Sequence, residues 1–163
     1  LQYGVKEFVG NLKKCGAYGV IIPDFGFGEY DFEMRQICIE NEIMFIELIA
    51  PLTPQKRIRE IASQTHSPFL YVIARNGLTG NQTLINRDVL DYIEDVAEIC
   101  ALEQKEIMVG FGINHESQLS ILKHKVYGVV AGSYFVNIIN DNLKSDNLME
   151  ILQSCTQKLL SFE

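Results

Sequence analysis

Short apolar runs alternate with amphipathic stretches along the chain, recurring roughly every 25 residues, which is the pattern of repeated βα units. Five runs are candidate strands, at residues 19–22, 44–49, 69–74, 107–109 and 128–131. Most of them are continuously apolar, as is typical of parallel strands that are covered on both faces. The alternation therefore predicts one α/β domain over residues 1–163, built from about five parallel βα units.

The stretches between these runs carry helical periodicity and helix-end residues. Apolar residues recur at i, i+3, i+4 and i+7 over residues 5–12, and Gly16 is placed to end this helix in the left-handed conformation. Capping residues indicate three further helix starts, at Thr53 followed by Pro54, at Asn86 and at Asn114. A last amphipathic helix is expected over residues 148–159.

One connection is longer than the others. Residues 75–86 are polar and rich in Asn, Thr and Gly, so they are expected to form a loop after the third strand. Long loops at strand ends are commonly lids over a site, and a tolerated insertion is the alternative.

Composition excludes two classes of partner. The net charge of −7 does not suit the phosphate backbone of a nucleic acid, which needs a clustered surplus of Lys and Arg. The longest apolar-rich stretch, residues 43–51, is interrupted by Glu47 and is far shorter than the ~20 residues that span a bilayer. The chain is also shorter than the roughly 250 residues of a complete (β/α)8 barrel.

Cysteine and histidine residues indicate neither disulfides nor a metal. The four cysteines are widely spaced on expected helices, at Cys15, Cys38, Cys100 and Cys155. We expect them to be reduced core residues of a cytoplasmic protein. The three histidines, His66, His115 and His124, lack metal-ligand spacing, and no metal site is predicted.

Two glycine motifs follow the last two strands, Gly110-Phe111-Gly112 and Gly132-Ser133. Glycine lets a phosphate approach backbone N–H groups closely, and barrels commonly bind phosphate at the loops after strands seven and eight. A short helix expected over residues 133–140 would add its N-terminal N–H groups and partial positive charge. Each motif alone indicates only a turn or a cap, whereas the pair predicts a phosphate site.

Five strings of residues in this chain resemble a known family, the tryptophan synthase alpha chain. The matching strings are GVIIPD at 19–24, APLTP at 50–54, RNGLTG at 75–80, GFGI at 110–113 and GS at 132–133. They occur in the family's order and cover about residues 3–140. RNGLTG is the most specific string, because a lid of this type after a tyrosine-containing strand is not expected from generic barrel packing.

The resemblance implies a fold and a reaction. The fold is a partial (β/α)8 TIM barrel in which this chain supplies strands 4 to 8. The reaction is the retro-aldol cleavage of indole-3-glycerol phosphate to indole and glyceraldehyde-3-phosphate, a lyase step of tryptophan biosynthesis. The family needs no cofactor in the alpha chain and passes indole to a beta subunit that holds pyridoxal phosphate, within a heterotetramer.

The resemblance also implies roles for individual residues. The phosphate-holding positions correspond to Gly80, Gly112, Gly132 and Ser133, the substrate pocket to Tyr71 and Phe111, and the lid to Arg75 and Thr79. The reaction needs two carboxylates with separate proton-transfer tasks. In the family these are a Glu and an Asp that precede the first helix of this chain, so catalytic residues are expected upstream of residue 1. The fragment itself is then expected to be inactive.

Two acidic residues require a separate interpretation. Asp24 follows the first strand at the catalytic end of the barrel, and the resemblance implies an orienting or subunit-contact role for it. The residues after it, 25–28, depart from the family pattern, which puts the fit to a beta subunit in doubt. Glu47 lies within an apolar strand, so it either faces the barrel interior with hydrogen bonds or pairs with an Arg or Lys.

Three alternatives stay open. Another phosphate-binding barrel, such as a sugar-phosphate epimerase or phosphoribosyl isomerase, would share the glycine sites but not the lid string. A catalytically dead remnant would bind phosphate compounds or a beta subunit without turnover. A complete doubly wound sheet is disfavoured, because no GxGxxG motif follows the first strand.

An incomplete barrel also has consequences for association. The strands at 19–22 and 128–131 would each lose a neighbour and expose unpaired backbone groups. Self-association through these edges is therefore a hypothesis, which a clean monomer in sedimentation would contradict.

Overall fold

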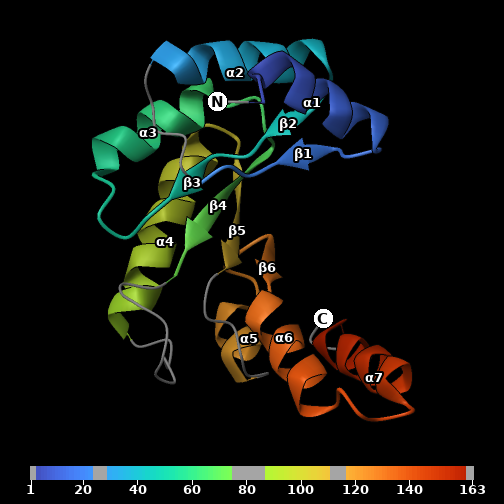
Figure 1. The fold of residues 1–163 in the computed structure, drawn as a ribbon. Coiled ribbons are helices and arrows are strands. Elements are labelled where there is room, and N and C mark those ends of the chain that lie inside the picture. The colour runs from blue at the N-terminus through green and yellow to red at the C-terminus, as the bar shows by residue number, and fades with distance from the viewer. Residues whose placement is uncertain (1–2, 24–28, 75–86, 111–116, 161–163) are drawn as a thin grey trace.

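The structure is a computed structural model that describes residues 3–23, 29–74, 87–110 and 117–160 (Figure 1). Its helices are α1 (Val5–Lys14), α2 (Glu29–Glu40), α3 (Gln55–Gln64), α4 (Arg87–Leu102), α5 (Ser117–Leu122), α6 (Gly132–Asp141) and α7 (Leu148–Leu160). Its strands are β1 (Gly19–Val20), β2 (Met44–Phe45), β3 (Leu48–Ile49), β4 (Phe69–Ile73), β5 (Glu106–Gly110) and β6 (Gly128–Val130). The alternation of strands and helices predicted from the sequence is thereby confirmed.

All strand pairs among the described residues are parallel. β1 pairs with β2, and β3, β4, β5 and β6 form a four-stranded sheet in that order. The single run predicted at 44–49 is split: the Ile46 N–H donates to the Val20 carbonyl at 2.9 Å, whereas the Glu47 carbonyl accepts from the Tyr71 N–H at 2.9 Å. One extended segment thus joins β1 on one side to β4 on the other.

The two faces of the sheet differ in burial. Leu70 and Val72 of β4 and Val109 of β5 are 0% exposed, and they pack in one core with α3 and α4. The side chains between them, including Tyr71 and Met108, are only half-buried. Figure 1 shows α3 and α4 on one side of this sheet. Strand alternation therefore assigns Tyr71 to the face opposite the helices.

A second, smaller core holds the N-terminal helices against β2. It contains Val9 of α1, Met34 and Cys38 of α2, and Ile43 and Phe45. No bounds for α2 were predicted from the sequence. Burial raises the pKa of Cys38 to about 11, so its thiol stays protonated at neutral pH.

Two local expectations need correction. Helix α3 begins at Gln55 with Pro54 as its N-cap residue, not with Thr53. The Thr53 hydroxyl instead accepts a hydrogen bond from the Ala50 N–H at 3.1 Å, which closes the turn before the helix. Cys15 is exposed at the end of α1 and is not a core residue, because the helix ends at Lys14 before the thiol can be covered.

Several helices end in the left-handed conformation. Gly16 after α1 has φ +77°, as predicted, whereas Glu42, Gln104 and His124 adopt φ values of +56°, +56° and +63°. A side chain in this region of φ is disfavoured by contact of Cβ with the backbone, and glycine avoids that contact. At the ends of α2, α4 and α5, a residue with a side chain therefore occupies a position at which glycine would be more stable.

Replacing Gln104 with glycine is expected to raise the free energy of unfolding by roughly 0.5–1 kcal/mol, since it relieves the left-handed strain after α4. Urea unfolding measures this change as a higher midpoint. Gln104→Ala is the matched control, because alanine keeps Cβ and the strain. Equal stabilisation by both substitutions would contradict the explanation.

Candidate functional site

The candidate site lies where the carboxyl ends of β4, β5 and β6 meet. Parallel register places Ile73 beside Gly110 and Gly110 beside Val130, so the three strands end at the same edge of the sheet. Ligand sites of parallel α/β folds form at this edge. Of the two predicted glycine motifs, Gly110 is thereby placed at the end of β5, and Gly132 and Ser133 lie at the start of α6, shortly after the neighbouring β6.

Several predicted site residues lie outside the described part of the chain. They are Asp24, Arg75, Thr79, Gly80, Phe111 and Gly112, together with the loop 75–86 and the cap residues Asn86 and Asn114. Their roles stay predictions. The described site residues are Tyr71, Gly132 and Ser133.

Tyr71 lies over Gly110. A Cβ atom added at Gly110 would lie 2.1 Å from Tyr71 Oη and 2.5 Å from its Cζ, so any side chain at this position would displace the ring. Burial raises the pKa of Tyr71, which keeps the phenol protonated near neutral pH. Gly110 is therefore the residue that allows Tyr71 to lie at the strand ends.

Gly110 lies in one of the two predicted glycine motifs, but no place in the site was predicted for it from the sequence. A glycine at the end of a buried strand signals a close approach, but the approaching group, 39 positions earlier in the chain, is visible only in the tertiary structure.

Helix α6 starts directly after β6, as predicted. Its N-cap residue, Ala131, makes no side-chain capping hydrogen bond, and the first N–H groups of a helix have no acceptor within the helix. Among the described residues, no atom lies within 4 Å of a Cβ built at Gly132, so none of them would contact a side chain at this position. Tyr134 is 9% exposed, and its ring packs edge-to-face on that of Phe135 with 5.5 Å between the ring centroids. This contact stabilises the first turn of α6.

The start of α6 has the features of an anion site. It offers N–H groups, the positive end of the helix dipole and the exposed Ser133 in one place. These groups suit a phosphate dianion without a nearby Lys or Arg.

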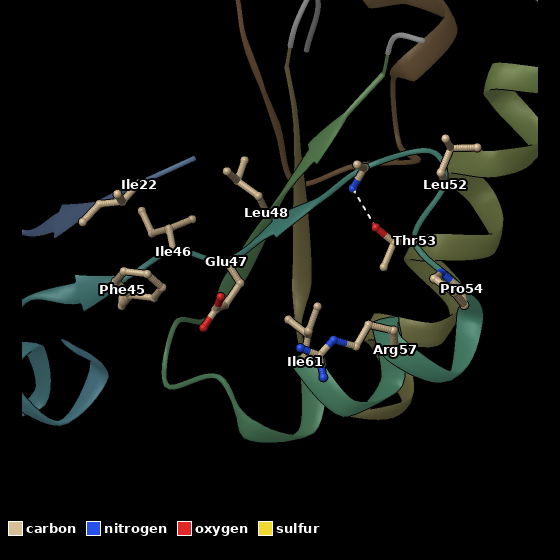
Figure 2. Close-up of a pocket in the computed structure, with 11 residues that line it drawn as sticks. Ile22, Phe45, Ile46, Glu47, Leu48, Leu52, Thr53, Pro54, Arg57 and Ile61 are labelled. Carbon is tan, nitrogen blue, oxygen red and sulfur yellow. Dashed lines mark hydrogen bonds between the residues drawn. The ribbon is translucent and has the colours of Figure 1, made fainter. Parts of the chain in front are cut away.

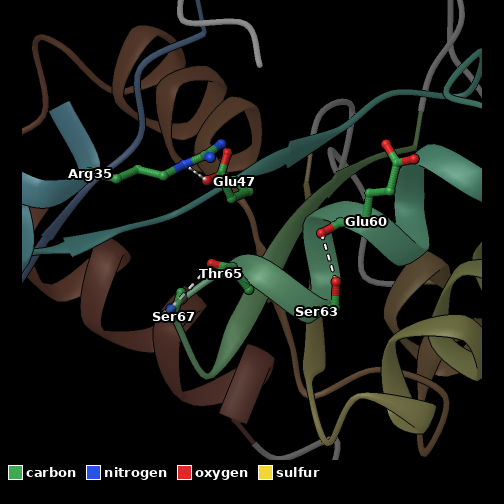
Figure 3. Close-up of polar contacts among 6 residues, drawn as sticks. All are labelled: Arg35, Glu47, Glu60, Ser63, Thr65 and Ser67. Atoms are coloured by element: carbon green, nitrogen blue, oxygen red, sulfur yellow. Dashed lines mark hydrogen bonds and ion pairs between the residues drawn. The ribbon is translucent and has the colours of Figure 1, made fainter. Parts of the chain in front are cut away.

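Glu47 does not belong to this site. The residue is 8% exposed, and its Oε1 accepts a hydrogen bond from Arg35 Nε at 2.6 Å (Figure 3). Arg35 comes from α2, and its guanidinium carbon lies 5.9 Å from the Phe45 ring centroid. Of the two predicted environments, pairing with an arginine is correct, and the barrel-interior alternative is wrong because Glu47 follows Phe45 by two residues and shares its face.

A cavity of about 400 Å³ lies beside the β2–β3 segment (Figure 2). Its lining is mostly apolar and includes Ile22, Ile46 and Leu48, with Thr53 from the turn before α3 and Arg57 from the first turn of that helix. Tyr71, Gly132 and Ser133 do not line it. The sequence did not indicate this cavity, because its walls come from separate βα units.

The described residues contain no cluster of three or more His, Cys, Asp or Glu that is arranged to hold a metal ion. In the part of the chain covered by the structure, no helix is long and apolar enough to cross a membrane.

Comparison with known proteins assigns the chain to a family. The family model described as tryptophan synthase alpha chain matches residues 1–161. The tryptophan synthase alpha chain of Helicobacter hepaticus is 37% identical over 167 residues, covering 99% of this chain and 61% of that protein. The alpha chain of Phocaeicola vulgatus is 31% identical over 159 residues, covering 94% of this chain and 60% of that protein.

Solved structures agree with the sequence comparison. A mutant tryptophan synthase alpha-subunit from Pyrococcus furiosus superposes with a TM-score of 0.80 at 29% identity, over 98% of this chain and 62% of its own. Subunit alpha from Campylobacter jejuni gives a TM-score of 0.71 at 25% identity, over 85% of this chain and 54% of its own. The P. furiosus structure that is described as the a2b2 complex gives a TM-score of 0.80 at 30% identity.

These matches confirm the predicted fold class, a partial (β/α)8 barrel with parallel strands. The chain spans less than two thirds of the length of the relatives it matches. The 163-residue chain belongs to the tryptophan synthase alpha chain family.

Proposed function

We propose that this chain is the phosphate-binding part of an indole-3-glycerol phosphate lyase, which releases indole and glyceraldehyde-3-phosphate in tryptophan biosynthesis. The observation that carries the proposal is the uncapped N-terminus of α6 beside Gly132, at the strand ends where Tyr71 lies over Gly110. An anion site and an aromatic surface at one edge suit a substrate with a phosphate at one end and an indole ring at the other.

The described residues have binding tasks in this proposal. N–H groups at the start of α6 and the Ser133 hydroxyl hold the phosphate, and Tyr71 shapes the pocket for the ring. Gly80, Gly112 and Phe111 complete the pocket, Arg75 and Thr79 form the lid, and Asp24 orients a catalytic group or contacts a partner subunit. This last set follows from the family resemblance.

The proton transfers require carboxylates that this chain does not supply in the described site. Glu47 points to the helix face and is bound to Arg35, so it is removed from the strand ends. We therefore propose that the catalytic Glu and Asp come from polypeptide outside these 163 residues and that the fragment alone is inactive. No cofactor is required of this chain.

The proposed partner is a tryptophan synthase beta subunit that holds pyridoxal phosphate. Support comes from the P. furiosus relative, whose structure is described as an a2b2 complex. A cytoplasmic location stays a prediction of the sequence.

A second function has support from the same observations. Because the described strand ends offer the N-terminus of α6 to an anion, whereas the buried Glu47 faces away from them, a catalytically dead protein that binds phosphate compounds or a beta subunit also fits. Membership of the family argues against a sugar-phosphate isomerase.

Two measurements test the proposal. Titration with inorganic phosphate, followed by ³¹P NMR, is expected to show binding that Ser133→Ala weakens about tenfold, since one hydrogen bond to a charged group is lost. Ser63→Ala is the matched control, because Ser63 is exposed on α3, and its hydroxyl donates to the Glu60 carbonyl of the same helix at 3.0 Å (Figure 3).

Indole release from indole-3-glycerol phosphate is the second measurement. The 163-residue chain is expected to release none, with or without a beta subunit, whereas a longer gene product that contains it is expected to do so. Release by the short chain would show that its own residues carry the proton transfers. A silent longer product would favour the dead binding protein.

A further inference from the structure

Two large side chains on the face of the sheet opposite α3 and α4 each lie on a glycine of the neighbouring strand. Tyr71 of β4 lies over Gly110 of β5. Met108 of β5 reaches across to β6 in the same way, since its Cε would lie 3.6 Å from a Cβ built at Gly128. This distance is an ordinary van der Waals contact, so the methionine covers β6 at a place where that strand has no side chain.

Met108 lies on the same face of the sheet as Tyr71 and beside it. The two residues are register partners in the parallel pair β4–β5, and Met108 is in turn the partner of Gly128. Partners in parallel strands point to the same face. Met108 is half-buried, whereas its chain neighbours Ile107 and Val109 are 2% and 0% exposed in the core that α4 covers. The methionine side chain therefore lies outside that core.

This position is one step below the strand ends, between the two parts of the candidate site. On this face β5 presents Met108 and then Gly110, and β6 presents Gly128 and then Val130. A molecule with a ring against Tyr71 and an anionic group at the start of α6 has to extend across the ends of β5 and β6. Because Gly128 has no side chain, Met108 is the residue that these two strands place beneath such a ring.

The chemistry of methionine suits this place. Its unbranched side chain adapts to the outline of an aromatic ring, and its sulfur makes favourable contacts with a ring at about 5 Å. The class of ligand, an aromatic ring joined to a phosphate, rests on the proposed function. We propose that Met108 forms the floor of the ring-binding part of the site and limits the size of the ring that fits.

Methionine methyl groups allow a direct test on the unchanged chain. Selective ¹³C labelling gives signals from the four methionines of the sequence. Indole, added without phosphate, is expected to shift the Met108 methyl signal progressively until the shift saturates, because the ring current acts on a methyl group in contact with the ring. Met34, 1% exposed in the N-terminal core, and Met149, 76% exposed on α7, are internal references and are expected to keep their positions.

Substitutions of Met108 test the limit on ring size. The chain has no tryptophan, so the fluorescence of added indole reports binding without a protein background. Met108→Ala loses the thioether contact, and indole binding is expected to weaken about tenfold. It also opens space, so the affinity for 5-methylindole relative to indole is expected to rise at least about threefold, as one more buried methyl group provides.

Two further variants serve as controls. Met108→Leu keeps the side-chain volume, so the ratio of the two affinities is expected to change less than about twofold. Met149→Ala removes an exposed methionine outside the site and is expected to change neither affinity. Circular dichroism checks that each variant is folded.

The affinity for inorganic phosphate separates the role of Met108 from the proposed function. All Met108 variants are expected to bind phosphate as tightly as the unchanged chain. Absence of an indole-dependent shift at Met108 would overturn its role, whether or not phosphate binds. A shift at Met108 in a chain that binds no phosphate would support the ring floor and contradict the proposed phosphate site. An unchanged ratio of affinities in Met108→Ala would overturn the limit on ring size.

Discussion

Arg35→Ala is expected to lower the free energy of unfolding by about 3–5 kcal/mol, because it removes a charged partner from a carboxylate that is 8% exposed. The Arg35–Glu47 pair joins α2 to the β2–β3 segment, and the guanidinium also lies over the Phe45 ring. Its loss leaves the charge on Glu47 in a poorly solvated place. Urea or thermal unfolding measures the change.

A double variant provides the control. Arg35→Met with Glu47→Leu replaces the pair by apolar side chains of similar size, and such replacements of buried pairs are often neutral or stabilising. We expect the free energy of unfolding of the double variant to be far closer to that of the unchanged chain than the value for Arg35→Ala is. A double variant as unstable as the single one would mean that lost packing, and not the unpaired charge, causes the effect.

Gly110→Ala is expected to lower the free energy of unfolding by roughly 1–3 kcal/mol, since the new Cβ would lie 2.1 Å from Tyr71 Oη and must displace the ring. Removing the ring should restore stability, so Gly110→Ala with Tyr71→Val is expected to show a coupling of about 1 kcal/mol or more in a double-mutant cycle. Tyr71→Phe should not rescue, because Cζ would still be 2.5 Å away.

Gly132→Ala is the matched glycine substitution at the next strand end. Its Cβ would meet nothing within 4 Å, so stability is expected to change by less than about 0.5 kcal/mol, while phosphate binding weakens. Gly110→Ala is expected to leave the affinity for phosphate unchanged. If the two substitutions gave the same pattern, the division of the site into a ring-positioning glycine and a phosphate-binding glycine would be wrong.

The sequence alone determined where the βα units lie. All five predicted runs contain strands, and the helices indicated by periodicity and capping are present at 5–14, 55–64, 87–102, 117–122 and 148–160. The short helix after Gly132 is also present. These features follow from local rules, since a strand needs a run of apolar residues and a helix needs a stripe and an end signal.

Only the tertiary structure decided which side chains meet. Glu47 pairs with Arg35, Tyr71 lies over Gly110, and the segment 44–49 divides between two neighbours. Cys15 was expected to be buried because it lies at an amphipathic helix, but α1 ends before it and the thiol is exposed. The physical reason is that periodicity records whether a residue faces a core, whereas the partner on that face comes from a distant unit whose position depends on how strands pair and helices pack.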